Sequence, residues 1–249
     1  MTLPLPNRFS FVIPVYNHYT TVWDVIDKAR KTGFPVIVVD DGSTDEMARV
    51  DPRKDRRLID ITFIRHVENW GKGAALTTGF RVAVKKSAWA VTVDADGQHH
   101  PSDYHSLVRA IPPGSRPIVV GKRLGMNSRK IPWTGRYGRK FSNFWVRLAG
   151  GPGVSDTQSG FRLYPLPEAL DLDIRARRFQ YEVESLVKAR WRGIPVLEAP
   201  VSVHYQPGVA RVSHFRPFVD FMRNTVVFSR LIFQRILFQP NFRRRRSAP

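Results

Sequence analysis

Residues 88–98 read AWAVTVDADGQ, a short apolar run that ends in two aspartates separated by one residue. The length of the run and its tryptophan and valine side chains are typical of a buried strand. The same arrangement occurs earlier, where the apolar residues 36–39 lead into the acidic segment 40–43, DDGS. Because ligands of parallel sheets bind beyond the carboxyl ends of the strands, we expect both acidic segments at one functional edge.

The remaining pattern predicts an α/β fold. Apolar runs predict strands at 9–14, 36–39, 61–64, 88–93 and 118–121. Helical patterns at 20–31 and 74–86 separate several of these strands, which indicates crossover connections. The fold class is therefore a mainly parallel sheet with flanking helices. Beyond residue 121, the sequence predicts a helix near 181–192 and a strand within 196–205.

Composition limits the chemistry and the partners. The 249 residues include 40 lysines and arginines against 21 acidic residues, a formal net charge of +19, so the expected partners are anionic. Nucleic acid, anionic lipid and phosphorylated substrates all meet that condition. The absence of cysteine excludes disulfides, thiolate zinc sites and cysteine nucleophiles.

The pair Asp94 and Asp96, with Gln98 close behind, is the sharpest candidate site. Hard oxygen ligands clustered this tightly suit Mg²⁺ or Mn²⁺. A metal held there would neutralise the charge of a departing diphosphate. In the alternative interpretation, the aspartates only cap a turn, because Asp-Gly is a common turn dipeptide. Asp40 and Asp41 also have two interpretations. Their carboxylates either accept hydrogen bonds from a ribose hydroxyl or a base amide, or only cap a turn.

Five segments in a fixed order carry a resemblance to a known family. They are 14–17 (PVYN), 40–43 (DDGS), 69–73 (NWGKG), 94–96 (DAD) and 159–162 (SGFR). In these segments the chain resembles glycosyltransferase family 2 and, within it, the dolichol-phosphate or polyprenyl-phosphate mannosyltransferase-like branch, from about residue 9 to about residue 214. The resemblance implies a GT-A fold, a UDP- or GDP-linked sugar donor, a divalent metal and inversion at the anomeric carbon.

The resemblance also implies residue roles. Donor-binding residues would be Pro14, Tyr16, Asn17, Asp40, Asp41, Lys72, Asp94, Ala95, Asp96, Gln98 and Arg123. The metal, Mg²⁺ or Mn²⁺, would be held by Asp94, Asp96 and Gln98. The catalytic residues would be Asp96, Asp156 and Arg162, with Asp156 as the general base if the acceptor is a hydroxyl. Further residues match the branch less closely: Arg136, Arg139, Glu182, Arg211, Ser213 and His214.

The implied acceptor is a lipid-linked group such as polyprenyl phosphate. The branch usually has an Arg-x-x-Gly-x-Ser segment late in the chain, whereas residues 205–214 read YQPGVARVSH. This departure leaves a hydroxyl of another lipid or of a polyene as the alternative acceptor. The base and the sugar of the donor, and the oligomeric state, are not fixed by the sequence.

The C-terminal part differs in kind from the rest. From residue 211 onward there are nine arginines and one acidic residue, interleaved with apolar side chains. We therefore expect a catalytic domain at 1–210 and a basic tail at 211–249 that forms one or two amphipathic helices on an anionic membrane surface. The alternative is a C-terminal helix packed on the domain. No signal peptide or apolar span is evident, so the expected location is cytoplasmic, peripheral at the inner face of the membrane.

Two other function classes fit the sequence less well. Gly71 and Gly73 lie near a dinucleotide-binding spacing, but the third glycine of that fingerprint is missing. A non-enzymatic nucleic-acid binder would explain the positive charge, yet no recognised nucleic-acid module is present. We therefore expect no nucleic-acid partner.

Overall fold

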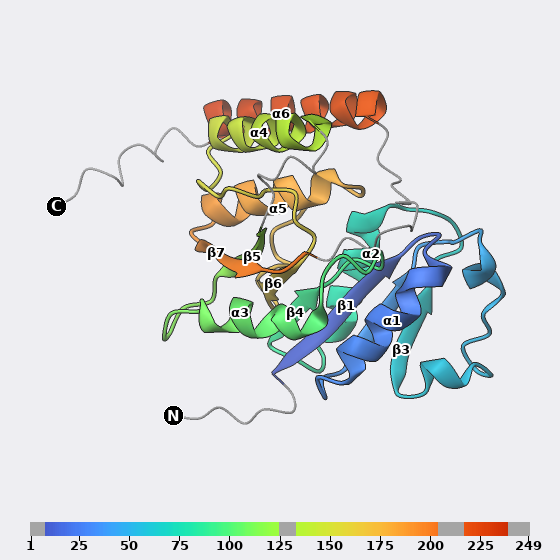
Figure 1. Ribbon diagram of the computed structural model, residues 1–249. Helices are drawn as coiled ribbons and strands as arrows, with labels where there is room; N and C mark the ends of the chain where they lie inside the picture. Colours follow the sequence, from blue (N-terminus) through green and yellow to red (C-terminus); the bar gives the residue numbers. More distant parts are fainter. Residues whose placement is uncertain (1–7, 125–132, 204–216, 239–249) are drawn as a thin grey trace.

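The computed structural model describes residues 8–124, 133–203 and 217–238, and seven strands of this part form one sheet (Figure 1). The order across the sheet is β3-β2-β1-β4-β6-β5-β7. The strands are β1 (Phe9–Val15), β2 (Val36–Asp40), β3 (Ile61–Arg65), β4 (Trp89–Thr92), β5 (Ile118–Arg123), β6 (Arg162–Pro165) and β7 (Val196–Val201). All neighbouring pairs are parallel except those of β6, which runs antiparallel to β4 and β5. The predicted mainly parallel α/β sheet is confirmed.

Helices cover both faces of the sheet. They are α1 (Tyr19–Arg30), α2 (Lys72–Ala83), α3 (Tyr104–Arg109), α4 (Trp133–Leu148), α5 (Gln180–Trp191) and α6 (Pro217–Phe238), with short 3₁₀ helices η1 (Glu46–Arg49), η2 (Arg56–Leu58) and η3 (Pro101–Asp103). α1 and α3 share one apolar core with the sheet, and α2 and α5 share the other. The central strand β1 is buried along its whole length because it faces both cores.

The alternation of β1 shows how the sequence builds these two cores. Phe11 and Ile13 belong to the core on the α1 side, and Val12 between them belongs to the core on the α2 side. Gly79 of α2 lies directly over Val12, where a larger residue would clash with the valine side chain. A strand apolar on both faces therefore marks the middle of the sheet.

α4 and α6 lie side by side as an outer layer over α5 (Figure 1). Apolar side chains from the three helices form a third core: Val146, Ala149, Val183, Val187, Phe228 and Leu231. The tail thus contains one described helix, and that helix packs on the domain. None of the helices in the described ranges is both long enough and apolar enough to span a bilayer.

Candidate active site

The order of the strands reverses at β1. From β1 the chain adds β2 and β3 on one side, and then returns to add β4 on the other side. Ligands of open α/β sheets bind at such a point, beyond the carboxyl ends of the strands. The loops that follow β1, β2 and β4 meet there. Asn17 accepts a hydrogen bond from the amide of Thr44 at 2.7 Å, and Thr21 donates to the carbonyl of Ala95 at 2.6 Å. Hydrogen bonds between the loops therefore fix the segments that the sequence singled out.

Asp94 stands at the end of β4, where it pairs with Lys72 at the start of α2. The lysine Nζ lies 2.6 Å from Asp94 Oδ1 and 2.6 Å from Glu182 Oε1 on α5. Burial by itself would raise the pKa of Asp94, but the charge and hydrogen bond of Lys72, together with the charges of His99 and His18, outweigh burial and hold that pKa below its usual range. Gly160 packs against the Asp94 carboxylate. Three distant parts of the chain therefore position this one carboxylate.

Asp96 lies on the same loop and has a different electrostatic environment. Its Oδ1 accepts a hydrogen bond from the Gln98 amide at 3.0 Å. Burial and the negative charge of Asp94 raise the pKa of Asp96. His99 follows, buried and stacked on Phe161, and burial lowers its pKa. A raised carboxyl pKa beside a second carboxylate is the condition that a bound cation would relieve.

The donor set fits a divalent metal that is completed by its substrate. No group of three or more His, Cys, Asp or Glu side chains arranged to hold a metal is found among the described residues. Mg²⁺ usually takes only one or two protein carboxylates and fills its shell with phosphate oxygens and water. Asp94 and Asp96 match that pattern better than a closed protein site, and the predicted third ligand, Gln98, lies on the same loop.

The two aspartates at the end of β2 are turned inward. Asp40 accepts hydrogen bonds from the Ser43 amide at 3.0 Å and from Arg65 at 2.6 Å. Asp41 accepts from the amides of Trp70 and Gly71 at 3.0 and 2.7 Å. Both carboxylates are buried, so they hold loops together. The nucleoside-binding role of these two residues stays a prediction, and the structure adds a shaping role.

The sequence did not indicate that His66 is a partner of Asp41. His66 Nδ1 lies 2.8 Å from Asp41 Oδ1, and the imidazole stacks on Trp70 with ring centroids 4.4 Å apart. Trp70 is 41% exposed and lies in the loop between β3 and α2. Only the contact between β2 and β3 brings the histidine to the aspartate, and no spacing in the sequence signals it.

Asp156 and Arg123 form a second charged pair near the ends of β5 and β6. Arg123 donates two hydrogen bonds to the Asp156 carboxylate, at 2.7 and 2.9 Å. Glu198 on β7 holds the same loop, because its Oε1 accepts from the Ser155 amide and hydroxyl and from the Asp156 amide. Sequence analysis did not single out Glu198, and no local motif marks it.

Arg162 lies inside the protein and does not reach the surface. It has no exposed surface, and its guanidinium donates to the carbonyls of Thr157, Ser159 and Glu182. Among the other expected donor-binding residues, Pro14 is buried in β1 and Tyr16 is half-buried just after it. Arg211, Ser213 and His214, and the side chains of Arg136 and Arg139, lie outside the described part.

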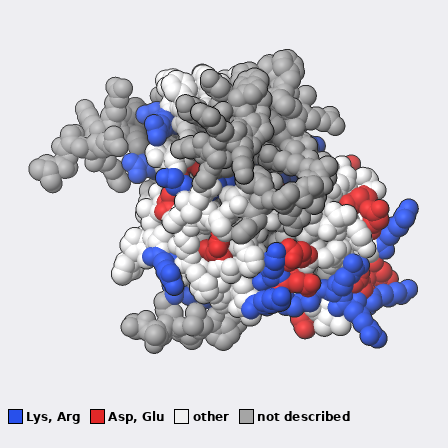
Figure 2. Space-filling view, viewed as in Figure 1, with Lys and Arg blue, Asp and Glu red and all other residues white. Residues whose placement is uncertain are grey.

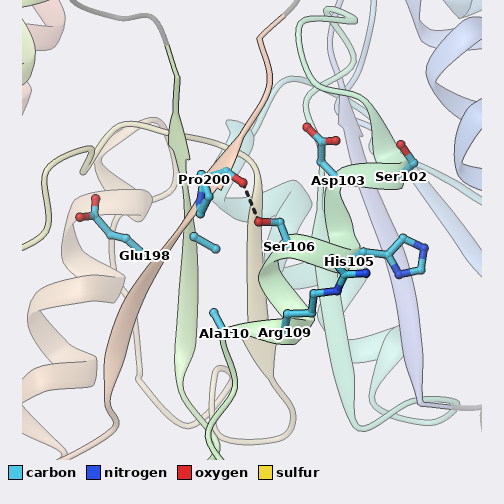
Figure 3. A pocket seen from close by; sticks show the side chains of 9 residues that line it. Ser102, Asp103, His105, Ser106, Arg109, Ala110, Glu198 and Pro200 are labelled. Carbon is cyan, nitrogen blue, oxygen red and sulfur yellow. Dashed lines mark hydrogen bonds between the residues drawn. The ribbon is translucent and has the colours of Figure 1, made fainter.

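One described pocket, of about 450 Å³, lies between α3 and β7, and Glu198 is among the residues that line it (Figure 3). Asp103 lies at one end and Arg109 at the other, and Ser106 donates a hydrogen bond to the Pro200 carbonyl across it. None of Asp94, Asp96 and Asp156 lines this pocket. We therefore place the candidate active site at the strand ends.

Surface charge around α1 is mixed. Figure 2 shows basic and acidic side chains next to one another over the part of the surface where Figure 1 places α1 and β3. The described pairs there include Lys28 with Asp24 at 2.6 Å and Arg57 with Asp55 at 2.6 Å. This face of the described residues therefore carries charges of both signs.

Comparisons with known proteins show what the chain is similar to. Residues 10–166 match the model of glycosyl transferase family 2. The chain is 29% identical to the UDP-N-acetylglucosamine–dolichyl-phosphate N-acetylglucosaminyltransferase of Methanococcus voltae, over 78% of this chain and 84% of that protein. It is 27% identical to the polyprenol monophosphomannose synthase of Mycolicibacterium smegmatis, over 83% and 81%.

Solved structures share the fold. The mannosyltransferase PcManGT of Pyrobaculum calidifontis, in complex with GDP-Man and Mn²⁺, superposes with a TM-score of 0.55 at 14% identity. That match covers 93% of this chain and 64% of the solved chain, which is therefore the longer of the two. At this identity the likeness concerns the fold, and it bears out the GT-A type that the motifs predicted.

Proposed function

The chain belongs to glycosyl transferase family 2, and we propose that it transfers a sugar from a UDP- or GDP-linked donor to a lipid-linked phosphate acceptor, with inversion at the anomeric carbon. The observation that carries the proposal is the position of Asp94 and Asp96, at the carboxyl end of β4 and at the switch point of the sheet. A nucleotide diphosphate binds most readily at that place in an α/β sheet.

A divalent metal is part of the proposal, and Asp94, Asp96 and Gln98 are the residues that would hold it. When bound, such a metal neutralises charge on the departing diphosphate. The chain itself fixes the two aspartates through Lys72, Gly160 and the Gln98 amide. The solved complex of the mannosyltransferase PcManGT contains Mn²⁺ together with GDP-Man, which supports a metal of this class here.

The Asp156–Arg123 pair supports a phosphate acceptor rather than a hydroxyl. A hydroxyl acceptor needs a base that removes its proton, whereas a phosphate monoester is already ionised near neutral pH. The Asp156 carboxylate is buried and receives two hydrogen bonds from Arg123. We assign it the role of holding Arg123 toward an anionic acceptor, and we assign Arg162 the role of positioning the 157–160 loop. The two relatives described above act, by their names, on dolichyl phosphate and on a polyprenol.

Exposed apolar residues on α4 and α6 support docking on a membrane. They are Phe144, Leu148, Val226, Phe233, Ile236 and Leu237, here called the apolar face, and each is at least 44% exposed. Two arginines of α6 turn toward the protein, since Arg230 bonds Glu184 and Arg235 bonds the carbonyl of Leu148. Amphipathic helices with this distribution bind in the headgroup region of bilayers, which supports a peripheral position of the protein on the membrane.

The test is a transfer assay with purified protein and vesicles. Labelled UDP- and GDP-sugars are supplied with polyprenyl phosphate or, separately, with the unphosphorylated polyprenol, in the presence of Mg²⁺ or Mn²⁺. Label in the lipid fraction with the phosphate alone supports the proposal, and β-configured product supports inversion. Transfer to the polyprenol instead would replace the phosphate acceptor with a hydroxyl acceptor.

A further inference from the structure

Lys72 occupies a place that a metal would need. It is the first residue of α2, and its ammonium lies 2.6 Å from Asp94 Oδ1 and 2.6 Å from Glu182 Oε1. The lysine side chain is 15% exposed, and the glutamate side chain 7%. A metal bound at Asp94 Oδ1 would lie close to this ammonium, and the repulsion between the two positive charges would drive one of them away from the carboxylate.

The surroundings determine which group can move. Gly160 lies against the Asp94 carboxylate and leaves no space for it to retreat. Glu182 is buried on α5, and Gly73 lets the first turn of α2 pack directly on Tyr181. Both carboxylates are therefore fixed from behind. The lysine ammonium stands at the end of a flexible four-carbon stem and is the movable member.

Charge favours the same interpretation. The Lys72 ammonium lies between the carboxylates of Asp94 and Glu182, at 2.6 Å from each, so it is the cation of this buried cluster. In this arrangement Lys72 supplies the positive charge beside Asp94. A nucleotide diphosphate would bring negative charge of its own, to which an ammonium binds as a point charge.

We propose that Lys72 is a positioning residue that holds the cation's place beside Asp94 and passes from Asp94 to the donor diphosphate when nucleotide and metal bind, with Glu182 as its second partner throughout. This inference rests on the proposed function. Its consequence is that metal alone binds weakly, because it must displace the ammonium without compensation. Metal together with nucleotide binds well, because the diphosphate accepts the ammonium.

Mn²⁺ binding measured by electron paramagnetic resonance tests the inference without any turnover. Mn²⁺ is titrated alone, and then with UDP or GDP, into wild-type protein, Lys72→Met and Lys72→Arg. We expect Lys72→Met to bind Mn²⁺ alone about tenfold more tightly than wild type, a typical coupling between two sites, whereas Lys72→Arg stays near wild type. The enhancement of Mn²⁺ binding by nucleotide should be correspondingly smaller in Lys72→Met.

Lys28→Met is the matched control, because Lys28 forms a lysine–aspartate pair of the same 2.6 Å length with Asp24 on the surface of α1. It should leave Mn²⁺ binding unchanged. Lys72→Gln replaces Lys72→Met if that variant does not fold. In one outcome, wild-type protein binds nucleotide with metal, but the neutral variants of Lys72 gain no Mn²⁺ affinity. That result overturns the role of Lys72 and leaves the proposed function standing. Wild-type protein without metal-dependent nucleotide binding overturns the proposed function and this inference together.

Discussion

Gly160 packs against the carboxylate of Asp94 so closely that no side chain fits between them. A methyl group built on Gly160 would lie 2.6 Å from Asp94 Oδ1 and closer still to Oδ2. The glycine comes from the loop before β6, and β6 pairs with β4, the strand that Asp94 follows. The glycine of the SGFR segment therefore forms the wall that fixes the first aspartate of the DAD segment.

Replacement of this glycine should damage the site more than the fold. Gly160→Ala forces the Asp94 carboxylate away from its position, and we expect metal-dependent nucleotide affinity to fall at least about tenfold, with a stability loss of about 1–3 kcal/mol from overpacking. Calorimetry and thermal unfolding measure the two effects. Gly153→Ala is the matched control, because nothing lies within 4 Å of its added methyl group. Equal metal-dependent nucleotide affinities for the two variants would contradict the role of Gly160 in fixing the Asp94 carboxylate.

Glu198 is predicted to position the Asp156 loop from β7. Glu198→Ala leaves three donors of Ser155 and Asp156 without their acceptor, which should cost about 1–3 kcal/mol of stability. Turnover should fall by about tenfold as the loop loosens, since a misplaced group of this kind costs rate. Glu198→Gln should restore most of the stability, because the amide oxygen still accepts. Chemical denaturation and initial rates check both variants, and the exposed Glu46→Ala serves as control.

Much of the fold could be predicted from the sequence. The predicted strands at 9–14, 36–39, 61–64, 88–93 and 118–121 correspond to β1 through β5 within a residue or two, because each is apolar on both faces. β6 was not predicted, since its four residues (RLYP) follow a loop without a break in composition. α4 was also missed: apolar residues recur along it at helical spacing (Tyr137, Phe141, Trp145 and Leu148), but the glycines and arginines between them resemble a basic loop.

The site could be predicted in part. Local spacing was enough to select Asp94 and Asp96, because both follow one strand directly. It could not show that Lys72 bonds Glu182, a contact across 110 positions of sequence. Nor could it show that Asp40 and Asp41 accept hydrogen bonds that hold loops together, beside the nucleoside-binding role that stays a prediction. Long-range contacts determine this shaping role, and the motif does not record them.

The apolar face of α4 and α6 predicts a membrane-binding phenotype. Phe233→Glu combined with Ile236→Glu places two negative charges on residues that are 61% and 68% exposed. We expect binding to anionic vesicles to drop at least about tenfold, because apolar insertion is lost and the lipid charge repels the carboxylates. Vesicle sedimentation measures the change.

Point substitutions test this face better than removal of residues 211–249. That deletion would also remove Phe228 and Leu231 from the core shared with α4 and α5, so a loss of binding could reflect unfolding. Ile59→Glu is the control, because Ile59 is 59% exposed beside η2, away from the α4–α6 layer. Vesicle binding that survives the double substitution on α6 would move the membrane contact elsewhere.

Substitution of Asp96 separates an effect on activity from an effect on stability most clearly. Its side chain lies on a strand-end loop, where its carboxylate accepts a hydrogen bond from the Gln98 amide of the same loop. Asp96→Ala should therefore keep the unfolding temperature within a few degrees of wild type, since about 1 kcal/mol shifts a domain of this size by roughly 2–4 °C. Sugar transfer should fall at least about a hundredfold, because a metal ligand is lost. Activity near the wild-type level would remove Asp96 from the site.

The most direct measurement is a calorimetric titration of UDP and of GDP into the purified protein, with and without Mn²⁺, repeated with Asp96→Ala. The account predicts that one nucleotide binds wild-type protein only when Mn²⁺ is present, and that Asp96→Ala abolishes this binding while the fold is retained. Nucleotide binding that is equally strong without metal, or unchanged in Asp96→Ala, would contradict a metal-assisted donor site at the end of β4.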